Sequence, residues 1–518
     1  MLYTNIIRNT YYDSLTLMRL SSNLSSLKGV KQAAVMMGTK LNKEFLKDAN
    51  LISDEVLQAS PSDVCICIEV EDNSFVKSVS ETIDDFFNNM HSQKDVIRRP
   101  RSISKAMDNM PDANLAVISV PGIYAAEEAK KALRAGLNVF LFSDNVSLDD
   151  ELMLKQEAEK NDLICMGPDC GTGIINGVAL GFANKVHRGN IGIVGASGTG
   201  IQEITVLIHG LGEGISHAIG TGGRDLKKPV NAISALTALK SLKDDEKTKV
   251  IVFVSKPPDK EIEEKVLMEL SKCGKPVIVL FLGSNPPNEL PQNIHWAKNM
   301  EDVAKCAVAL LKDEEIPPYS IEDGINKIEK SRIKDEIEKL DKNQTFLRGL
   351  YSGGTLCDEA IFILAEMFSE IWSGHNVGSG VKELENPFAS VGHSLIDMGE
   401  DIFTRGKPHP MIDYGTRISR MLDEAEDEEV AVILLDVVIG YGSHPNPKEI
   451  LIPTIKKIRE SGKQSNRYVS IVASVCGTDI DPQNLEEQTK ALEQEGVLVF
   501  SSNAKAAYAA GLIANKAL

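Results

Sequence analysis

Short apolar runs alternate with amphipathic stretches along almost the whole chain. In the first third, apolar runs lie at residues 33–37, 64–70, 115–120, 139–142 and 163–166. Between them, residues 124–135 and 148–160 place apolar side chains at helical spacing. Continuous apolar strands that alternate with helices are typical of a parallel sheet covered on both faces. The pattern therefore predicts an α/β protein with parallel sheets.

The same alternation returns on both sides of a charged connector. Apolar runs occupy residues 191–194, 215–219, 250–254 and 277–282, and then 346–351, 395–398, 430–438, 469–475 and 497–500. Residues 313–344 contain a Pro pair near their start and are dense in charge, which predicts a solvated and partly helical linker. We therefore expect three Rossmann-like or flavodoxin-like domains, at residues 1–166, 167–312 and 345–518.

Composition narrows the function classes. The 518 residues carry a net charge of −18, which argues against nucleic acid as the main partner. The longest apolar run, at residues 430–439, is too short to span a bilayer, and the first residues lack the apolar core of a signal peptide. Eight cysteines without a C-x-x-C pair indicate reduced thiols, and no cluster of residues has the spacing of a zinc site. We expect a cytoplasmic enzyme without a metal site.

Residues 192–203 read GIVGASGTGIQE, an apolar strand that ends in a Gly/Ser/Thr turn and continues as a helix. A helix N-terminus has unpaired backbone N–H groups and a positive dipole, which suit a phosphate. The segment lacks the Lys of a Walker A loop and the G-x-G-x-x-G spacing of a dinucleotide site. Two interpretations stay open: an anion site at Ser197, Gly198, Thr199 and Gly200, or a tight turn capped by Ser197 or Thr199.

Two loops of the last third have the same character. LYSGGTLCDEA at residues 350–360 is again strand, turn and helix, and DVVIGYGSHPNPKE at residues 436–449 is a strand followed by a Gly-rich loop. Phosphate sites in open α/β sheets lie outside the carboxyl ends of the strands. Two domains could therefore close on one phosphate, with contributions from Ser352, Gly353, Gly354 and Thr355, or from Gly440 and Gly442.

Longer motifs resemble a known family. MGPDCGTGIING (166–177), GNIGIVGASGTGIQE (189–203), GLGEGISHAIGTGGRD (210–225) and GKPVIVLFLGSNPP (274–287) are similar to the α-subunit of succinyl-CoA synthetase. HSLIDMGEDIFTRGKPHPMID (393–413) with EEVAVILLDVVIGYG (428–442) resembles the carboxy-terminal domain of its β-subunit. The whole arrangement, including VMMGTKLNKEF (35–45), resembles the FdrA-type acyl-CoA synthetases. The resemblance implies a CoA-binding-like Rossmann domain at residues 1–166 and a ligase-like domain on each side of the linker.

The chain departs from the synthetases at two places that bear on function. Residues 281–302 lack the Gly-His-Ala-Gly motif of the phosphorylated histidine, since His295 has a different context, and no stretch resembles the ATP-binding domain of the β-subunit. The N-terminal third also lacks the Gly-rich signature that holds CoA in the α-subunit.

The resemblance leaves three functional hypotheses. FdrA-type proteins are implied to be subunits of an oxamate carbamoyltransferase of anaerobic allantoin breakdown, in which oxalurate and phosphate give oxamate and carbamoyl phosphate. Such a subunit would bind phosphate or carbamoyl phosphate and a small oxo-acid amide, within a hetero-oligomer, and carbamoyl transfer would need no cofactor. The second hypothesis is an ADP-forming acyl-CoA ligase or CoA-linked acyl transferase, with CoA as ligand and partner subunits for the nucleotide. The third is a non-catalytic scaffold.

The loop RGKPHPMID contains three polar candidates for catalysis. His409 lies between two prolines, and this stiff setting suits acid–base chemistry or contact with a substrate carboxylate, with a loop-structural role as the alternative. Arg405 and Lys407 could hold a carboxylate or could be solvated loop charges.

Other candidates lie at strand ends. In GPDCG, Asp169 lies in a loop near the active centre of the synthetases, and Cys170 is a candidate nucleophile without an evident neighbouring His. Lys256 directly follows an apolar strand and could face the crevice. Asp397 and Asp436 lie in or at the end of apolar strands, where each needs a buried partner or a role in a site.

Overall fold

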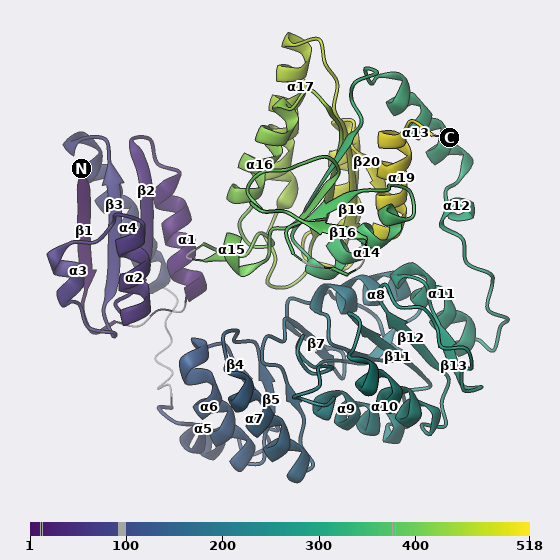
Figure 1. Ribbon diagram of the computed structural model, residues 1–518. Helices are drawn as coiled ribbons and strands as arrows, with labels where there is room; N and C mark the ends of the chain where they lie inside the picture. Colours follow the sequence, from purple (N-terminus) through teal and green to yellow (C-terminus); the bar gives the residue numbers. More distant parts are fainter. Residues whose placement is uncertain are drawn as a thin grey trace. The chain divides into compact units, whose positions relative to one another are not determined.

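Most of the predicted strands and helices are present in the computed structural model of the chain (Figure 1). The structure describes residues 1–10, 12, 14–91, 100–375, 377–378, 380–405 and 407–517. Contacts divide the chain into two compact units, residues 1–100 with 401–409 and residues 101–400 with 410–518. Within the described residues, we find no helix that is long and apolar enough to cross a lipid bilayer.

The first unit contains a three-stranded sheet of order β1-β3-β2. Its elements are β1 (Leu2–Ile7), α1 (Ser14–Ser25), β2 (Val30–Met37), α2 (Lys40–Asp48), α3 (Asp54–Gln58), β3 (Val64–Val70), η1 (Asn73–Phe75), α4 (Val76–His91) and α15 (Asp401–Thr404). The sequence predicts parallel strands here, whereas β3 pairs antiparallel with both neighbours. The apolar run shows that β3 is buried on both faces, but it does not fix the direction of the neighbouring strands.

The second unit begins with a small parallel sheet of order β4-β5-β6. Its elements are α5 (Ile103–Asn109), β4 (Leu115–Ile118), α6 (Gly122–Arg134), β5 (Asn138–Leu141), α7 (Leu148–Lys160) and β6 (Cys165–Met166). Residues 1–166, expected as one domain, therefore contain two separate sheets, one in each unit.

A seven-stranded sheet of order β13-β12-β11-β9-β10-β7-β8 follows. Its elements are β7 (Thr172–Ile175), β8 (Val178–Gly181), β9 (Arg188–Gly195), α8 (Gly198–Gly210), β10 (Ile215–Gly220), α9 (Ile233–Asp244), β11 (Val250–Ser255), α10 (Lys260–Ser271), β12 (Val277–Phe281), β13 (Ile294–Trp296) and α11 (Met300–Leu311). The strands from β13 to β10 are parallel, as predicted, and the hairpin β7–β8 adds an antiparallel edge.

The last sheet has seven parallel strands in the order β16-β15-β17-β14-β18-β19-β20. Its elements are β14 (Phe346–Tyr351), α14 (Gly354–Ala365), β15 (Ile371–Ser373), β16 (Val381–Glu383), β17 (Ser394–Asp397), α16 (Gly415–Glu426), β18 (Val430–Val438), α17 (Pro447–Gln464), β19 (Ser470–Cys476), α18 (Leu485–Gln494), β20 (Leu498–Phe500) and α19 (Asn503–Asn515).

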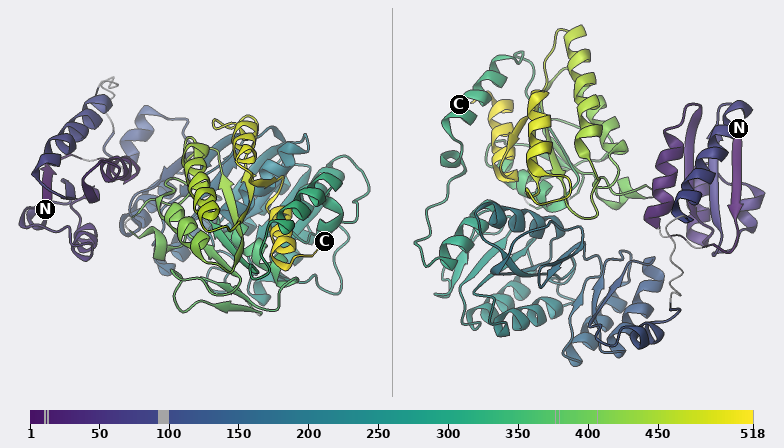
Figure 2. Two further views of the ribbon diagram at one scale, coloured as in Figure 1. Left: turned by 90° about the horizontal axis from the view of Figure 1, so that it is seen from above. Right: turned by 180° about the vertical axis from the view of Figure 1, so that it is seen from behind.

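The charged linker is helical in part and docks on the last sheet's helices. It contains α12 (Ile321–Gly324) and α13 (Lys327–Glu338), and α13 packs beside α19, as both ribbon figures show (Figures 1 and 2). Glu336 is buried and accepts hydrogen bonds from the hydroxyls of Tyr468 at 2.8 Å and Ser470 at 2.7 Å. The predicted helical character is present, but this face of the linker is not solvated.

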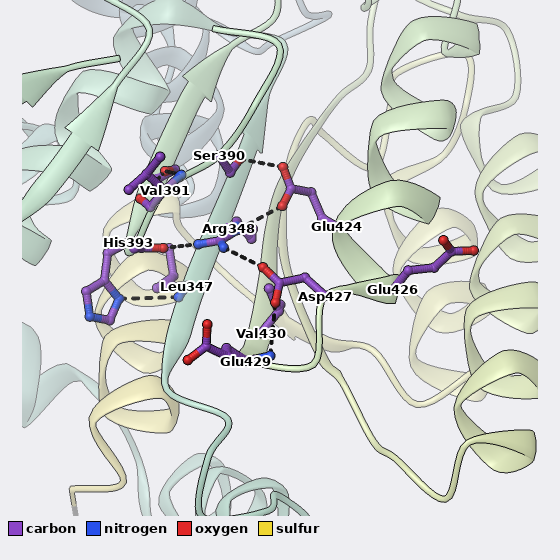
Figure 3. Close-up of polar contacts among 12 residues, drawn as sticks. Leu347, Arg348, Ser390, Val391, His393, Glu424, Glu426, Asp427, Glu429 and Val430 are labelled. Carbon is purple, nitrogen blue, oxygen red and sulfur yellow. Dashed lines mark hydrogen bonds and ion pairs between the residues drawn. The ribbon is translucent and has the colours of Figure 1, made fainter. Parts of the chain in front are cut away.

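A buried ion-pair network holds β14 to α16 (Figure 3). Arg348 is 2% exposed, and its guanidinium donates hydrogen bonds at 2.8 Å to Glu424 and Asp427 and a third to the carbonyl of Gly392. Arg420, one turn before Glu424 in α16, donates to the same carboxylate. Buried charges are tolerated when they are paired in this way. The network fixes β14, from whose end the turn at residues 352–355 departs.

Candidate functional site

Two helix N-termini from different sheets meet inside the second unit. Ser197 caps α8, with its hydroxyl accepting a hydrogen bond from the Gly200 N–H at 3.1 Å. The same hydroxyl lies 2.6 Å from the hydroxyl of Thr355 in the first turn of α14. The Thr355 N–H donates to the hydroxyl of Thr199 at 3.3 Å. The structure therefore brings together the two Gly/Ser/Thr turns that the sequence singles out, at the carboxyl ends of β9 and β14.

The α8 end keeps backbone donors for a ligand. Among the described residues, no acceptor is found for the N–H groups of Gly198 and Thr199, and both residues are partly exposed. Helix N-termini with free N–H groups attract anions. Ser197 forms the cap that one of the two interpretations of this turn expects, and the anion site stays a prediction.

The α14 end is occupied in part by a carboxylate of the protein. Asp436 in β18 is fully buried and accepts hydrogen bonds at 2.8 Å from the N–H groups of Ser352 and Gly353 and at 3.0 Å from the Ser352 hydroxyl. Arg417 forms an ion pair with Asp436 at 2.6 Å. Asp436 is thus the buried anion of this helix end, which leaves Gly354 and Thr355 nearest to the opposite turn.

The alternative loop of the last third has a different place. Gly440 and Gly442 adopt left-handed backbone angles, φ 111° and 81°, and the N–H of Gly440 donates to Gln483 at 3.0 Å. The neighbouring Tyr441 N–H donates to the carbonyl of Ala183 at 2.8 Å. The loop at residues 440–442 thus contacts the segment that precedes β9, and so it links the two large sheets at a different place from the turn at residues 197–200.

Two buried glutamates cross between the sheets behind the turns. Glu203 in α8 accepts a hydrogen bond at 2.9 Å from the N–H of Asn503, the first residue of α19. Glu359 in α14 accepts one at 2.7 Å from the N–H of Met300, the first residue of α11. Each glutamate is the sixth residue of its helix, in GTGIQE and GTLCDE. This shared spacing is a sequence signal for the pair, although the partners of the two glutamates lie far away in sequence.

A line of alternating charges runs along one side of α14. Lys256, at the carboxyl end of β11, pairs with Asp358 at 2.6 Å. Asp358 also pairs with Nε2 of His375 at 3.0 Å, and the Nδ1 of His375 lies 2.8 Å from Glu400. Burial opposes the charge of His375, but these two carboxylates outweigh burial and raise its pKa to about 10. The imidazole is therefore a cation at neutral pH.

The sequence suggests that Lys256 could face a crevice, and the structure pairs it with Asp358 in α14, the helix that follows β14 of the last sheet. His375 was not predicted, because it lies in an irregular segment after the short strand β15 and its partners are distant in sequence.

Asp397, at the end of β17, also faces α14. It is 8% exposed, and burial raises its pKa to about 7. Its Oδ1 accepts the N–H of Gly399 at 2.8 Å. Its Oδ2 lies 2.5 Å from where a Cβ on Gly354 would stand. Only glycine at residue 354 allows the carboxylate this close to the start of α14.

The geometry argues against Cys170 as a nucleophile. Cys170 is 2% exposed, its thiol lies 3.5 Å from the carbonyl of Thr172, and burial raises its pKa to about 12. A nucleophilic cysteine needs a thiolate, which this environment disfavours. The neighbouring Asp169 is exposed and has a left-handed backbone, φ 55°.

The remaining candidates belong to the first unit. Arg405 is exposed, and His409 is half-buried. Burial lowers the pKa of His409 to about 4, so its imidazole is neutral at pH 7 and does not act there as a cation for a carboxylate. A neutral imidazole still suits the role of a proton acceptor, and both residues stay candidates.

Three protein-family models match parts of the chain. CoA-ligase matches residues 350–513, CoA binding domain matches residues 186–283, and the heavy metal-associated domain of AllF matches residues 1–101. The CoA binding match thus covers β9, α8 and β11 rather than residues 1–166, where the sequence resemblance places a CoA-binding-like domain.

The chain is similar to one protein over nearly its whole length and to others over part of it. YahF of Escherichia coli K12, an uncharacterized protein, is 43% identical over 96% of this chain and 95% of its own length. Subunit alpha 1 of the ADP-forming succinate–CoA ligase of Archaeoglobus fulgidus is 28% identical over 34% of this chain and 60% of that subunit. Among solved structures, an acetyl-coenzyme A synthetase of Ca. Korarchaeum cryptofilum is 16% identical, with a TM-score of 0.33, over 80% of this chain and 84% of that one.

The match of residues 1–101 to a heavy metal-associated domain raises the question whether this region binds a heavy metal. The cysteines of this region do not suit such a metal. Cys65 and Cys67 are fully buried on one face of β3, and burial raises the pKa of their thiols to about 11 and 12. Soft metals bind thiolates that they can reach. Among the residues that the structure describes, no group of three or more His, Cys, Asp or Glu side chains could hold a metal ion.

Proposed function

Because the chain belongs to the FdrA-like acyl-CoA synthetase family, we propose that it is an acyl-transfer subunit of the CoA-ligase type. It binds the phosphate of an acyl phosphate where α8 and α14 meet. The acyl group passes between this phosphate and an acceptor, which in a ligase is the thiol of CoA.

One observation carries the proposal: the N-terminal turns of α8 and α14 lie in contact, with 2.6 Å between the hydroxyls of Ser197 and Thr355. Two positive helix ends that face each other favour a ligand of negative charge between them. The Asp436 carboxylate already accepts the N–H groups of Ser352 and Gly353, which directly precede α14, and this leaves the larger share of the attraction to the N–H groups of Gly198 and Thr199.

The chain's own groups would act by electrostatic stabilisation. When the carbon–oxygen bond to phosphate breaks, negative charge grows on the phosphate, and fixed N–H donors are most effective at such a position. Lys256 lies on the same side of α14 and is held by Asp358, so a more negative ligand can draw its ammonium away.

Carbamoyl phosphate is one such acyl phosphate, and carbamoyl transfer to or from oxamate stays a prediction beside the ligase. It uses the same phosphate contacts, and it differs in the acceptor, an amide nitrogen instead of a thiol. Either reaction would take place in a hetero-oligomer, where partner subunits supply the nucleotide for a ligase or complete the carbamoyl-acceptor site.

The test is calorimetric titration of the purified chain with inorganic phosphate, acetyl phosphate and carbamoyl phosphate. We expect binding of all three, weakened by Thr199→Ala because a hydroxyl beside the anion is lost. The loss of one hydrogen bond to a charged group costs about 1.5–3 kcal/mol, which is roughly 10- to 150-fold in affinity. Phosphate release is then measured with two substrate pairs, acetyl phosphate with CoA and carbamoyl phosphate with oxamate. The pair that releases phosphate faster identifies the acceptor as a thiol or as an amide nitrogen.

Gly198→Ala and Gly210→Ala form a matched pair at the two ends of α8. A Cβ on Gly198 meets only Thr172 Oγ1 at 3.4 Å and Gly171 Cα at 3.9 Å, and a Cβ on Gly210 meets nothing within 4 Å. Both variants should fold, and only Gly198→Ala should weaken phosphate binding, because its methyl group crowds the anion. Equal affinities in the two variants, or no phosphate binding by the unchanged chain, would refute the phosphate site.

A further inference from the structure

We infer that Asp397 is the residue that exchanges a proton with the acyl-transfer reactants at the α8–α14 site. The inference rests on the proposed function and adds the group that carries the proton. Nothing in the family descriptions or the names of the relatives assigns a role to this residue.

The position of Asp397 is the first argument. One carboxylate oxygen is fixed by the N–H of Gly399 at 2.8 Å. Among the described residues, no hydrogen-bond donor is found for the other oxygen, Oδ2, which lies against Gly354 at the first turn of α14. The Asp397 side chain is only 8% exposed, and an oxygen there without a protein donor is available to a proton, to water or to a ligand. By contrast, both carboxylate oxygens of Asp436, in β18 of the same sheet, have protein donors.

The charged groups around Asp397 come from several elements. Lys256 approaches from β11, Asp358 and Cys357 from α14, and Glu400 from the segment after β17. His375, after β15, pairs with both Asp358 and Glu400.

Most of these neighbours keep their charge near neutral pH. The carboxylate of Asp358 raises the pKa of Lys256 against the effect of burial. His375 and Lys256 hold the pKa of Asp358 low, again against burial. Burial raises the pKa of the Cys357 thiol well above its usual range. Asp397 is the group of this set whose pKa burial brings to about 7, where a proton carrier works best.

The proposed step balances without a cofactor. The acceptor, a thiol or an amide N–H, loses its proton to Asp397 Oδ2 as its sulfur or nitrogen forms a bond to the acyl carbon. The bond between the acyl carbon and the phosphate oxygen breaks, and its electron pair stays on the oxygen. Asp397 then returns the proton to the phosphate. The reverse reaction follows the same path.

Binding of sulfate between pH 6 and pH 8 tests the inference without any turnover. Sulfate is a tetrahedral dianion whose own charge stays constant over this range, so a change in affinity reports on the protein. Protonated Asp397 can donate a hydrogen bond to the anion, whereas ionised Asp397 repels it. With a pKa of about 7, the affinity of the unchanged chain should fall roughly tenfold from pH 6 to pH 8.

Asp397→Asn should bind sulfate with little dependence on pH, because it cannot ionise. Its amide oxygen keeps an acceptor for the Gly399 N–H, and Asp397→Ser is the second variant if Asp397→Asn does not fold. Asp423→Asn, which changes an exposed carboxylate on α16, is the control and should retain the tenfold fall.

The outcomes separate the two proposals. If the unchanged chain binds sulfate equally at pH 6 and pH 8, the role of Asp397 is refuted while the anion site stands. A fall in affinity that persists in a folded Asp397 variant also refutes it. If sulfate and phosphate do not bind at any pH, the proposed function fails and the inference with it.

Discussion

Asp436 and Asp397 both lie in apolar strands of the same sheet, yet their carboxylates have different surroundings. Asp436 is satisfied by two N–H groups, a hydroxyl and Arg417. Asp397 has one N–H partner and an open oxygen beside Gly354. The sequence predicts that each needs a partner or a site, but it cannot separate the two cases, since their partners come from other strands and helices.

Removal of the Asp436 carboxylate should destabilise the whole second unit. Asp436→Ala leaves Arg417, which is fully buried, without its counter-charge and leaves the Ser352 and Gly353 N–H groups without an acceptor. Breaking a buried pair in this way costs about 3–5 kcal/mol. Urea denaturation should show a loss of this size, against a change within about 0.5 kcal/mol for the exposed Asp423→Ala. A loss below about 1 kcal/mol in Asp436→Ala would contradict the assigned role.

His375 should stabilise the fold in a pH-dependent way. Its pKa is raised to about 10 by Asp358 and Glu400 despite burial, whereas an unfolded histidine has a pKa of about 6.5. The folded chain therefore holds this proton more tightly, and the stabilisation is complete below pH 6.5 and is lost as pH rises through 10. The free energy of unfolding should differ more between the unchanged chain and His375→Gln at pH 6 than at pH 9.5. A difference independent of pH would mean that the imidazole is not charged.

At the scale of helices and strands, the continuous apolar strands are predictable, and the short or partly polar strands are not. The predicted runs at 64–70, 346–351 and 430–438 coincide with β3, β14 and β18. The strands β1, β7, β8, β13, β15 and β16 were missed, because they are short or mix polar with apolar residues and so lack a clear period. His375 escaped notice for the same reason, since it follows β15.

The helices α8, α11, α14 and α19 pack against one another between the two large sheets. The sequence pattern only suggests this packing. Glu203 and Glu359 each cap the last helix of the opposite sheet. The likeness of the two Gly/Ser/Thr turns was visible in the sequence. The hydrogen bonds of Glu203 and Glu359 to the opposite sheet's helices depend on how the two sheets face each other. No local sequence pattern contains that information.

This arrangement predicts that stability falls as pH rises from 5 to 8. Burial raises the pKa of Glu359 to about 8, against about 4.3 for an unfolded glutamate. Within this window the folded chain binds more protons than the unfolded chain, so the free energy of unfolding decreases with pH. Glu359→Gln cannot titrate, and its melting temperature should decline less over the same range. Parallel declines in both proteins would show that Glu359 is ionised in the fold throughout.

At the scale of the whole second unit, the two large sheets share one core. A single hydrophobic cluster contains Ile201 and Ile204 from α8 together with Leu356 and Ile361 from α14. Polar contacts add to it, among them the hydrogen bonds of Asn184 to Asp481 and to the carbonyl of Ile439, both at 2.8 Å. The linker therefore joins two halves that are already held together, and its covalent continuity matters less than the interface.

Cleavage of the linker should leave the halves associated. A protease site inserted between Glu315 and Ile316 lies in an irregular stretch between α11 and α12, where Glu315 is exposed. After cutting, the two pieces should elute together in gel filtration, because each leaves apolar surface and buried donors that only the other covers. The cleaved Glu203→Ala/Glu359→Ala double variant should separate at lower urea, since Asn503 and Met300 each lose the acceptor for a buried N–H. Separate elution of the unchanged pieces in buffer would show instead that the linker, and not the α8–α14 interface, holds the candidate site together.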